Sequence, residues 1–199
     1  MQVFFYFFVP EFLSFNLYQN TVILKFKTSP MKKIFLCSLL TALMISCKSN
    51  QKINASAEIQ LVNITLDSWH KAAAEAKFEL YFSLMTSDGV FIGTDPTENW
   101  QNKAFQTFSK PYFDKGKAWN FSSFQRNIYF SDDASVVWFD ELLTTQMKIC
   151  RGSGVLKKQN GSWKIAQYVL SMTIPNENTD EVVKIKSTFD EAFIEKLKK

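Results

Sequence analysis

The chain has 199 residues, and 46% of them are hydrophobic, which is enough for one core of ordinary domain size. From Lys48 onward, 19 Lys and Arg residues stand against 18 Asp and Glu residues, a net charge of +1, and no basic stripe stands out. This balance excludes the usual profile of a nucleic-acid-binding protein. With one histidine and three cysteines in the whole chain, the usual nitrogen and sulfur site for a metal is also excluded, and we expect no cofactor.

Residues 1–30 do not fit the organisation of the rest of the chain. Their longest apolar run, Val3–Val9, is followed by a proline and a glutamate, so it is too short for a membrane span or a good secretory signal. We interpret Met31 as the true start of the protein. The alternative is a genuine extension, which would place the signal described next inside the chain and change the cellular location.

Residues 31–47 are typical of a secretory signal. The segment opens with a methionine and two lysines, continues with an almost wholly apolar run over 34–45 and ends in Ser46-Cys47. Its last residues resemble a bacterial lipoprotein box, which implies that Cys47 is diacylated and becomes the mature N-terminus. We therefore expect a lipid-anchored protein of the bacterial cell envelope, facing the periplasm or the exterior, with 48–64 as a polar tether. An ordinary signal peptide with an incidental cysteine is the alternative.

A helix is predicted after the tether, with Thr65 as its N-cap. Apolar residues then recur at spacings of three and four, and this periodicity places them on one helical face. The face comprises Leu66, Trp69, Ala73, Ala76, Leu80 and Leu84. Ser87-Asp88-Gly89 is expected to end the helix and to turn the chain into a short strand over 90–94.

A second helix is predicted from Pro96 to about Ser109. Asp95 supplies a capping residue, Pro96 takes the favoured first helical position, and Glu98 adds a carboxylate three residues after the cap. This helix should bury Trp100, Ala104 and Phe108. Lys110-Pro111 should then interrupt it, because the residue before a proline disfavours helical backbone.

Strands follow, predicted over 117–130, 135–147, 150–158 and 162–174. Asn160-Gly161 lies between the last two, and this dipeptide favours a two-residue hairpin because both positions tolerate positive φ. Such a turn predicts three cross-strand pairs: Leu156 with Ile165, Lys157 with Lys164, and Lys158 with Trp163. Beyond Pro175, we expect a loop over 176–179 and an amphipathic helix over 180–199, lying on the domain or on a partner.

This order of elements resembles the nuclear-transport-factor-2-like (NTF2-like) fold. The motifs that look like its SnoaL-like branch are Leu66-Asp67-x-Trp69-His70, Val90-Phe91-Ile92-Gly93-Thr94-Asp95, Lys110-Pro111-Tyr112-Phe113, Trp138-Phe139-Asp140-Glu141 and Trp163-Lys164-Ile165. The resemblance covers about 65–175. It implies an α+β, cone-shaped (cystatin-like) domain, in which a curved antiparallel sheet is closed by N-terminal helices and a pocket lies between the first helix and the concave sheet face. It also implies a homodimer, because many relatives pair through the sheet.

Three residues are candidates for catalysis: Asp95, Asp140 and His70. In ketosteroid-isomerase-like relatives, an aspartate at the end of the first strand is the general base, and the resemblance implies that role for Asp95, although its context also fits a helix cap. The oxyanion stabilisers of those enzymes are not matched. Trp69 or His70 stands where a tyrosine is expected, and Arg151-Gly152 stands where an acid is expected. Steroid isomerase chemistry is therefore disfavoured.

Asp140 and Glu141 should point to opposite faces of the sheet, because strand side chains alternate. The inward carboxylate needs a partner, which Arg126 or Arg151 could supply, either as a structural ion pair or as part of a binding site. The alternatives for His70 are a role in the pocket and a hydrogen-bonded structural role.

Aromatic residues are the remaining signal. Candidates to line a pocket are Trp69, Tyr81, Trp100, Trp119 and Tyr168, with Arg151 or Asp140 fixing the orientation of the ligand. Arg126 and Arg151 are also candidates to bind the ligand. We therefore expect an envelope-tethered domain that binds a small apolar or aromatic organic molecule, with catalysis not established. One alternative is a cofactor-independent isomerase or dehydratase with an aspartate base. The other is a non-enzymatic lipoprotein that interacts with proteins through its C-terminal helix and open sheet face.

Overall fold

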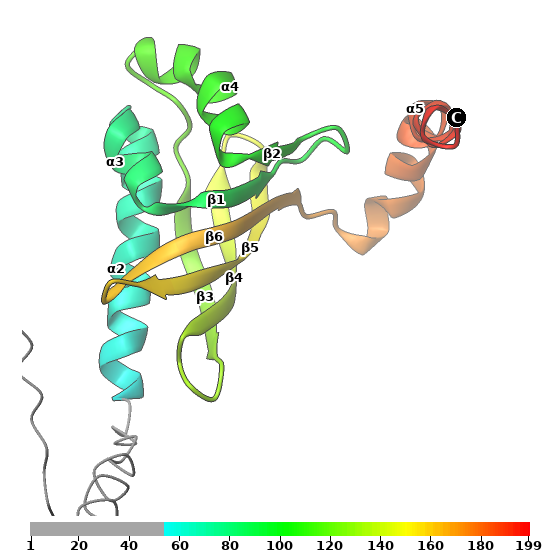
Figure 1. The fold of residues 1–199 in the computed structure, drawn as a ribbon. Helices are drawn as coiled ribbons and strands as arrows, with labels where there is room; N and C mark the ends of the chain where they lie inside the picture. Colours follow the sequence, from blue (N-terminus) through cyan, green and yellow to red (C-terminus); the bar gives the residue numbers. More distant parts are fainter. Residues whose placement is uncertain (1–53) are drawn as a thin grey trace, which may run out of the picture. The chain divides into compact units, whose positions relative to one another are not determined.

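Six strands form a sheet in the computed structural model, which describes residues 54–199 (Figure 1). The strands are β1 (Met85–Ile92), β2 (Asn99–Gln101), β3 (Ser122–Phe130), β4 (Val136–Thr145), β5 (Lys148–Gln159) and β6 (Ser162–Met172). Their order is β2-β1-β6-β5-β4-β3, and neighbouring strands are antiparallel except for the parallel pair β1 and β6. The predicted signal, with Cys47, and the first part of the tether lie outside the described residues.

The helices of the described chain are α2 (Ala55–Ala74), α3 (Phe78–Ser83), α4 (Asn102–Asp114) and α5 (Thr179–Leu197), with a 3-10 helix at Asn176–Asn178. α2 packs against β6 and β3, whereas α3 and α4 pack against β1. Figure 1 shows the strands curving beside these helices. The predicted α+β class, with a curved and largely antiparallel sheet, is confirmed.

α2 begins at Ala55, well before the predicted cap at Thr65. The Asn54 side chain accepts a hydrogen bond from the Ala57 backbone N–H at 3.3 Å and caps the first turn. Thr65 lies inside the helix, where its hydroxyl donates to the Leu61 carbonyl at 2.9 Å. The end of the predicted tether is therefore helical.

The predicted first helix is interrupted after Ala74. Ala76 takes a left-handed conformation with φ 54°, and the Lys77 N–H donates to the Ala72 carbonyl at 2.8 Å. This pattern is a Schellman-type helix end, in which glycine is the usual residue. Because alanine is the strongest helix former, the sequence carries no signal for the break. The chain then turns into α3, which buries Tyr81.

β1 runs through Ser87-Asp88-Gly89, which the sequence predicts as a turn. Its pairing with β6 is irregular between Met85 and Val90, so the strand bulges at the residues that looked like a turn. The chain thus enters the sheet directly at the end of α3.

The second helix begins later than predicted. Asp95–Glu98 form the turn between β1 and β2, and the Gly93 N–H closes this turn by donating to the Glu98 carbonyl at 2.9 Å. α4 starts only at Asn102. The capping pattern at Asp95 therefore belongs to a turn and not to a helix.

This later start changes which residues of α4 are buried. The buried set is Asn102, Phe105, Ser109 and Phe113. Ala104, predicted to be buried, is exposed, while Trp100 and Phe108 are half-buried and stack with ring centroids 4.8 Å apart. Pro111 lies inside α4, so the predicted interruption at that proline is wrong.

The hairpin between β5 and β6 is confirmed. Asn160 and Gly161 have positive φ angles of 50° and 79°. The three predicted pairs are all present: Leu156 with Ile165, Lys157 with Lys164, and Lys158 with Trp163. Because a one-residue slip would move every side chain to the opposite face, this turn fixes which residues face the core between Leu156 and Ile165. Farther from the turn, the register shifts between Val155 and Leu156.

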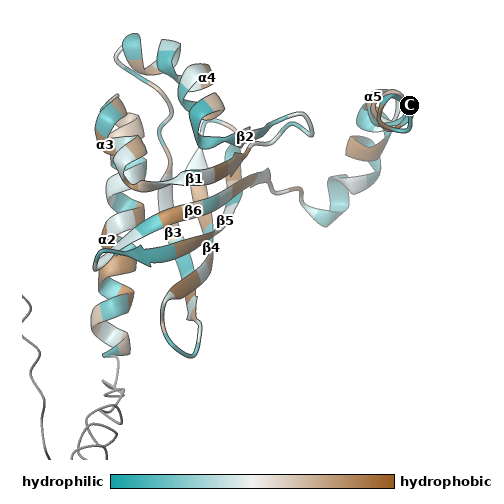
Figure 2. Ribbon diagram, viewed as in Figure 1, coloured by the Kyte–Doolittle hydropathy of each residue, from teal (hydrophilic) through white to brown (hydrophobic). Residues whose placement is uncertain are grey.

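The buried interior is rich in aromatic rings. In β4, the odd-numbered residues from 137 to 145 are buried and the even-numbered ones are not, as strand alternation requires. The rings at the centre belong to Trp69, Tyr81, Phe91, Phe105, Phe113, Phe139 and Tyr168. Figure 2 shows hydrophobic segments recurring along the strands and on α2. Helices and sheet are therefore joined by an aromatic core.

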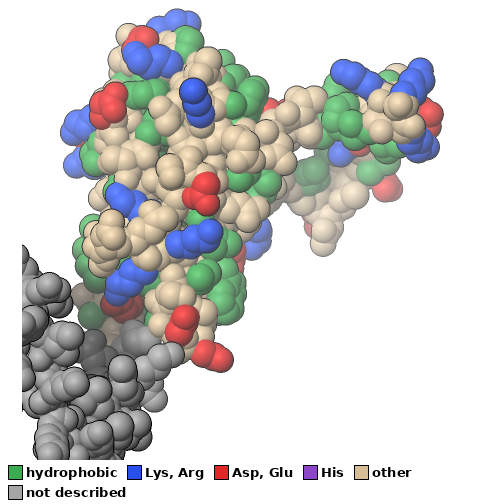
Figure 3. All heavy atoms as spheres, viewed as in Figure 1, with side chains coloured by type: hydrophobic (Ala, Val, Ile, Leu, Met, Phe, Trp, Pro, Cys, Tyr) green, Lys and Arg blue, Asp and Glu red, His purple; other side chains and the backbone are tan. Residues whose placement is uncertain are grey.

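α5 confirms the predicted C-terminal helix. Within the described chain none of its residues is buried, and Ile185 is 81% exposed. On the face shown in Figure 3, basic and acidic side chains are interspersed. Across residues 54–199, no helix combines the length and the apolar character that a membrane crossing requires.

Candidate functional site

A buried carboxylate, Glu141, lies in the interior. It is fully buried on β4 and is the inward member of the pair Asp140 and Glu141. Its Oε1 accepts hydrogen bonds from His70 Nε2 at 2.8 Å and from the Tyr168 hydroxyl at 3.0 Å. Its Oε2 accepts from Arg126 Nε at 2.9 Å and Nη2 at 2.7 Å. We call these four residues, Glu141, His70, Arg126 and Tyr168, the Glu141 cluster.

Arg126 adds further contacts between the Glu141 cluster and α2, which also carries His70. It lies directly opposite Glu141 in the β3–β4 register, and only 8% of its side chain is exposed. Nη1 donates to Asn63 Oδ1 at 2.8 Å, and Nη2 donates to Asp67 Oδ1 at 2.9 Å. Asn63 and Asp67 are not among the predicted site residues. Their spacing of four on α2, which puts both on one helical face, is the signal that could find them.

Opposing effects act on the pKa of Glu141. Burial raises the pKa, but the hydrogen bonds and charges of His70 and Arg126 lower it by a larger amount. The pKa is therefore lowered from 4.5 to about 2. Glu141 is therefore ionised at neutral pH. Burial and the adjacent Glu141 carboxylate raise the pKa of Tyr168 well above its usual range. The Tyr168 phenol thus keeps its proton and donates a hydrogen bond to Glu141.

His70 has one ring nitrogen inside the cluster and one outside it. Because Glu141 is ionised and only accepts, Nε2 carries the proton of their shared hydrogen bond. Nδ1 is buried and has no hydrogen-bond partner among residues 54–199. The predicted site residues His70, Arg126 and Tyr168 are thus brought together around Glu141.

Gly152 permits the contact between Tyr168 and Glu141. A Cβ at this position would lie 2.1 Å from the Tyr168 hydroxyl oxygen and 3.0 Å from Glu141 Cγ. A side chain is therefore excluded by the cluster itself. A glycine within a strand often marks a close approach, and Gly152 makes room for a tyrosine of the same chain.

The two aspartates predicted as general bases lie outside the interior. Asp95 is exposed in the β1–β2 turn, and its Oδ1 accepts hydrogen bonds from the Thr97 hydroxyl at 2.5 Å and the Thr97 N–H at 2.8 Å. These bonds lower the pKa of Asp95. Asp140 points to the outer sheet face, where it pairs with Arg151 at 3.3 Å. Neither aspartate is therefore placed beside His70.

Three of the predicted ligand-lining aromatics pack on one another. Trp69 stacks on Tyr81 with ring centroids 4.7 Å apart, and its ring lies 4.7 Å from that of Tyr168. All three side chains are buried. They fill the space between α2 and the sheet, so the interior expected to hold a ligand is occupied there by the protein's own rings.

Among the hollows beside this packed centre, two are lined by candidate residues and by Phe121. The aromatic hollow, of about 210 Å³, is lined by Phe91, Gly93, Thr94, Glu98, Phe105, Phe108, Trp119, Phe121, Gln146, Met147 and Leu170. The His70 hollow, of about 390 Å³, is lined by Asp67, His70, Lys71, Ala74, Asn120, Phe121, Ser122 and Ser123. Phe121 borders both hollows. Trp119, a predicted ligand residue, lines the first hollow, and His70, a candidate for catalysis, lines the second.

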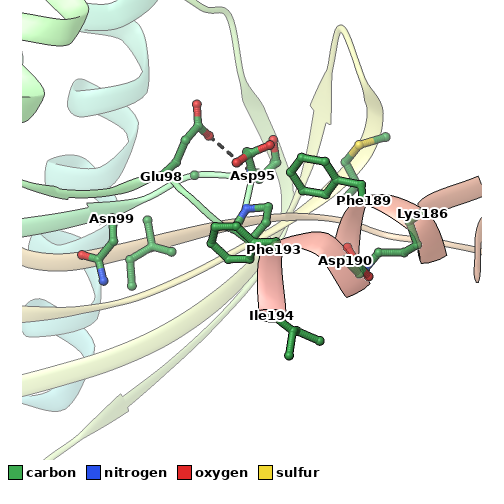
Figure 4. A pocket seen from close by; sticks show the side chains of 13 residues that line it. Asp95, Glu98, Asn99, Lys186, Phe189, Asp190, Phe193 and Ile194 are labelled. Atoms are coloured by element: carbon green, nitrogen blue, oxygen red, sulfur yellow. Dashed lines mark hydrogen bonds and ion pairs between the residues drawn. The ribbon is translucent and has the colours of Figure 1, made fainter. Parts of the chain in front are cut away.

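A larger open groove, of about 680 Å³, lies between the β1–β2 turn and α5. Figure 4 shows Phe189 and Phe193 of α5 near Asp95, whose backbone N–H donates to Glu98 Oε2 at 3.3 Å. Phe189 is half exposed even here. Asp95 therefore belongs to this groove and not to the surroundings of the Glu141 cluster.

No group of three His, Cys, Asp or Glu residues in the described part of the chain could hold a metal ion. Cys150 is buried and free, with its sulfur 3.5 Å from the Thr145 hydroxyl. Its surroundings are those of a packed core residue.

Comparison with models of protein families matches residues 62–175 to the SnoaL-like domain, which is more than half of the chain. The chain belongs to the SnoaL-like family. The match includes every residue of the Glu141 cluster, whereas the start of α2 and all of α5 lie outside it. None of the curated proteins compared with the chain matches it.

Solved structures share the fold of the SnoaL-like domain. An NTF2-like protein of unknown function from Pseudomonas putida has 11% identity and a TM-score of 0.53, over 62% of this chain and 92% of its own. A protein from Novosphingobium aromaticivorans provisionally named scytalone dehydratase has 11% identity and a TM-score of 0.52, over 59% and 85%. Another from that organism, provisionally named aromatic ring hydroxylase, has 9% identity and a TM-score of 0.50, over 58% and 89%. At such identities these similarities establish the NTF2-like fold alone.

Proposed function

We propose that the SnoaL-like domain binds a small apolar or aromatic molecule in the aromatic hollow. The observation that supports this function is the lining, which is mostly aromatic and aliphatic with a few polar groups, Thr94, Glu98 and Gln146. Such a lining is typical of ligand pockets, whose usual volumes are about 300–1,000 Å³. At about 210 Å³, the aromatic hollow fits a molecule with one ring better than a larger one.

Binding is favoured over turnover because the candidate carboxylates are not arranged for proton transfer. A general acid or base works best when its pKa lies near the working pH. The pKa of Glu141 is held at about 2, and that of Asp95 is lowered. Asp140 pairs with Arg151 on the outer face. An isomerase or dehydratase that uses an aspartate base is therefore the weaker proposal.

The test is a calorimetric titration of the protein with toluene, compared between two tryptophan variants. Thr94→Trp adds a large side chain to the lining of the aromatic hollow, whereas Thr107→Trp adds the same side chain to the exposed side of α4. We expect saturable binding to the wild type and to Thr107→Trp, and affinity lower by about tenfold or more in Thr94→Trp, equivalent to about 1.4 kcal/mol. Equal affinity for toluene in both variants would show that toluene does not bind in the aromatic hollow.

We also propose that a lipid on Cys47 holds the domain at the bacterial envelope. The support is the basic, apolar and small-residue pattern of residues 31–47. Mass measurement of the mature N-terminal peptide tests this: a diacylated Cys47 is expected. An unmodified peptide that begins elsewhere would contradict the proposal. In a second test, Cys47→Ser should release the protein from the membrane fraction.

A homodimer through the outer sheet face is a further part of the proposal. Tyr129 and Trp138 stack there with centroids 6.0 Å apart, and 47% and 48% of these residues are exposed. Exposed aromatic side chains of this kind are enriched in protein interfaces. Light scattering during size-exclusion chromatography should give a dimer mass for the wild type and a monomer mass for Trp138→Glu. A monomeric wild type would contradict it.

A further inference from the structure

Glu98 is the one charged residue among those that line the aromatic hollow. The other polar side chains of the lining, Thr94 and Gln146, are neutral. Glu98 is half-buried, whereas Asp95, three residues earlier in the same turn, is exposed and lies outside the lining. The aromatic hollow therefore has a single carboxylate in an otherwise uncharged wall.

Gly93 makes room for the Glu98 side chain in this wall. A Cβ at Gly93 would collide with Glu98 Oε2 and would lie 2.9 Å from Cδ, so the carboxylate lies against the bare backbone of the glycine. The turn between β1 and β2 holds the two residues together, because the Gly93 N–H donates to the Glu98 carbonyl at 2.9 Å. Both residues line the aromatic hollow, so the backbone of the turn keeps the carboxylate beside it.

The Glu98 carboxylate has no cationic partner within residues 54–199. None of the ion pairs in that part of the chain includes it, and Lys186, which borders the open groove together with Glu98, pairs with Asp190 at 3.0 Å. Oε2 accepts one long hydrogen bond, from the Asp95 N–H at 3.3 Å, and Oε1 accepts none in the described chain. Figure 4 shows one Glu98 oxygen facing the Asp95 backbone and the other turned away from it. Most of the acceptor capacity of this carboxylate is therefore open to a ligand.

The aromatic side of the hollow is a stack of rings. The rings of Phe91 and Phe105 have centroids 4.2 Å apart and planes that differ by 7°, and the Trp119 ring lies 5.8 Å from that of Phe105 at 26°. A flat ring can pack beside such a stack. The face of a tryptophan ring also attracts cations, more strongly than that of tyrosine or phenylalanine. The rings and the carboxylate together therefore favour a ligand that is both aromatic and positively charged.

We propose that the ligand of the aromatic hollow is a small aromatic amine, whose ammonium group binds the Glu98 carboxylate while its ring packs beside Phe105 and Trp119. This assignment rests on the proposed function, to which it adds the chemical class of the ligand. A carboxylate accepts hydrogen bonds and an ammonium group donates them, so the two are complementary in charge and in hydrogen bonding. Glu98 also disfavours an aromatic acid, because like charges repel. The hollow therefore selects an amine over an acid that has the same ring.

Calorimetric titration with benzylamine, which carries an ammonium group at neutral pH, and with toluene, which carries none, tests the proposal. Glu98→Gln keeps the size of the side chain and removes its charge. In this variant the affinity for benzylamine should fall about fivefold or more, while the affinity for toluene stays the same. Asp95→Asn is the matched control, because it removes a carboxylate of the same turn that lies outside the lining, and it should leave both affinities unchanged. Equal losses for the two compounds in Glu98→Gln, or an unchanged affinity for benzylamine, would overturn the proposal.

A second measurement needs no variant. At low salt, the wild-type protein should bind benzylamine about tenfold or more tightly than benzoate, and the difference should narrow as the salt concentration rises. Equal affinities for the two ions would contradict the assignment even if Glu98→Gln does not fold. Toluene binding without a preference for benzylamine over benzoate would reject the amine and keep the proposed function. Binding of none of the three compounds would reject both.

Discussion

Arg126 and Glu141 face each other across β3 and β4, and the guanidinium places Nε and Nη2 at 2.9 Å and 2.7 Å from the same carboxylate oxygen. This ion pair is buried, so removing either charge would leave the other one buried without its partner. It also joins the sheet to α2 through Asn63 and Asp67. The stability of the domain should therefore respond strongly to changes at this pair.

Arg126→Leu should destabilise the domain severely. The substitution leaves Glu141 charged and buried with only His70 and Tyr168 as partners, and breaking a buried ion pair on one side costs about 3–5 kcal/mol. Urea unfolding at pH 7 measures the change. Arg151→Leu is the control, because its pair with Asp140 is on the surface and should contribute about 0–1 kcal/mol. Similar losses in the two variants would argue against a special role for the buried pair.

The stability of the domain should fall in acid because of Glu141. The pKa of its carboxyl is about 2 in the folded chain, compared with 4.5 for an ordinary glutamate, the value expected in the unfolded chain. Because the unfolded chain takes up the proton first, the contribution of Glu141 is complete above about pH 4.5 and is lost as the pH falls to about 2. This contribution is about 3 kcal/mol, from the difference between these two pKa values.

Glu141→Gln isolates this effect. The variant should be less stable than the wild type at pH 7, and its stability should change less between pH 4.5 and pH 2, as measured by urea unfolding at each pH. Asp133→Asn controls for a surface carboxyl whose pKa is also lowered, to about 2, by hydrogen bonds from Ser131 and Ser135. A Glu141→Gln profile parallel to that of the wild type would refute the assignment.

Gly152→Ala should be destabilising in a way that depends on Tyr168. The added methyl would lie 2.1 Å from the Tyr168 hydroxyl oxygen, and crowding of this kind costs about 1–3 kcal/mol. Tyr168→Phe removes that oxygen, so the alanine should cost less in the double variant. A double-mutant cycle of thermal or urea unfolding measures the coupling. Strict additivity would mean that Gly152 is required for another reason.

Removal of residues 176–199 should leave the stability of the remaining chain nearly unchanged, within about 0.5 kcal/mol. Within the described chain no residue of α5 is buried, and α5 lies outside the matched SnoaL-like segment. Urea unfolding of the shortened protein provides the measurement. A large loss of stability would show that the apolar face of α5 packs on the domain in solution.

The features predicted well from the sequence are those with local chemical causes. Asn160 and Gly161 tolerate positive φ, so the hairpin and its register as far as Leu156 and Ile165 follow from two residues. The inward carboxylate of β4 and its need for an arginine follow from strand alternation and the cost of burying a charge.

The features missed depend on contacts between distant residues. Ala76 has no intrinsic tendency to end a helix, and only tertiary packing places it in a left-handed conformation. Asp95 has the pattern of a helix cap, but the pairing of β1 with β2 holds it in a turn. Likewise, the sequence cannot reveal that Phe121 borders two hollows, since their linings come from several separate elements.

The proposed binding of a small apolar molecule is tested most directly by locating a bound probe. Nuclear Overhauser effects between the toluene methyl group and the assigned aromatic protons of the protein report which rings lie next to the probe. We predict contacts to Trp119 and Phe105, which line the aromatic hollow. Contacts confined to Trp138 and Tyr129 on the outer sheet face, or none at saturating toluene, would contradict the proposed function.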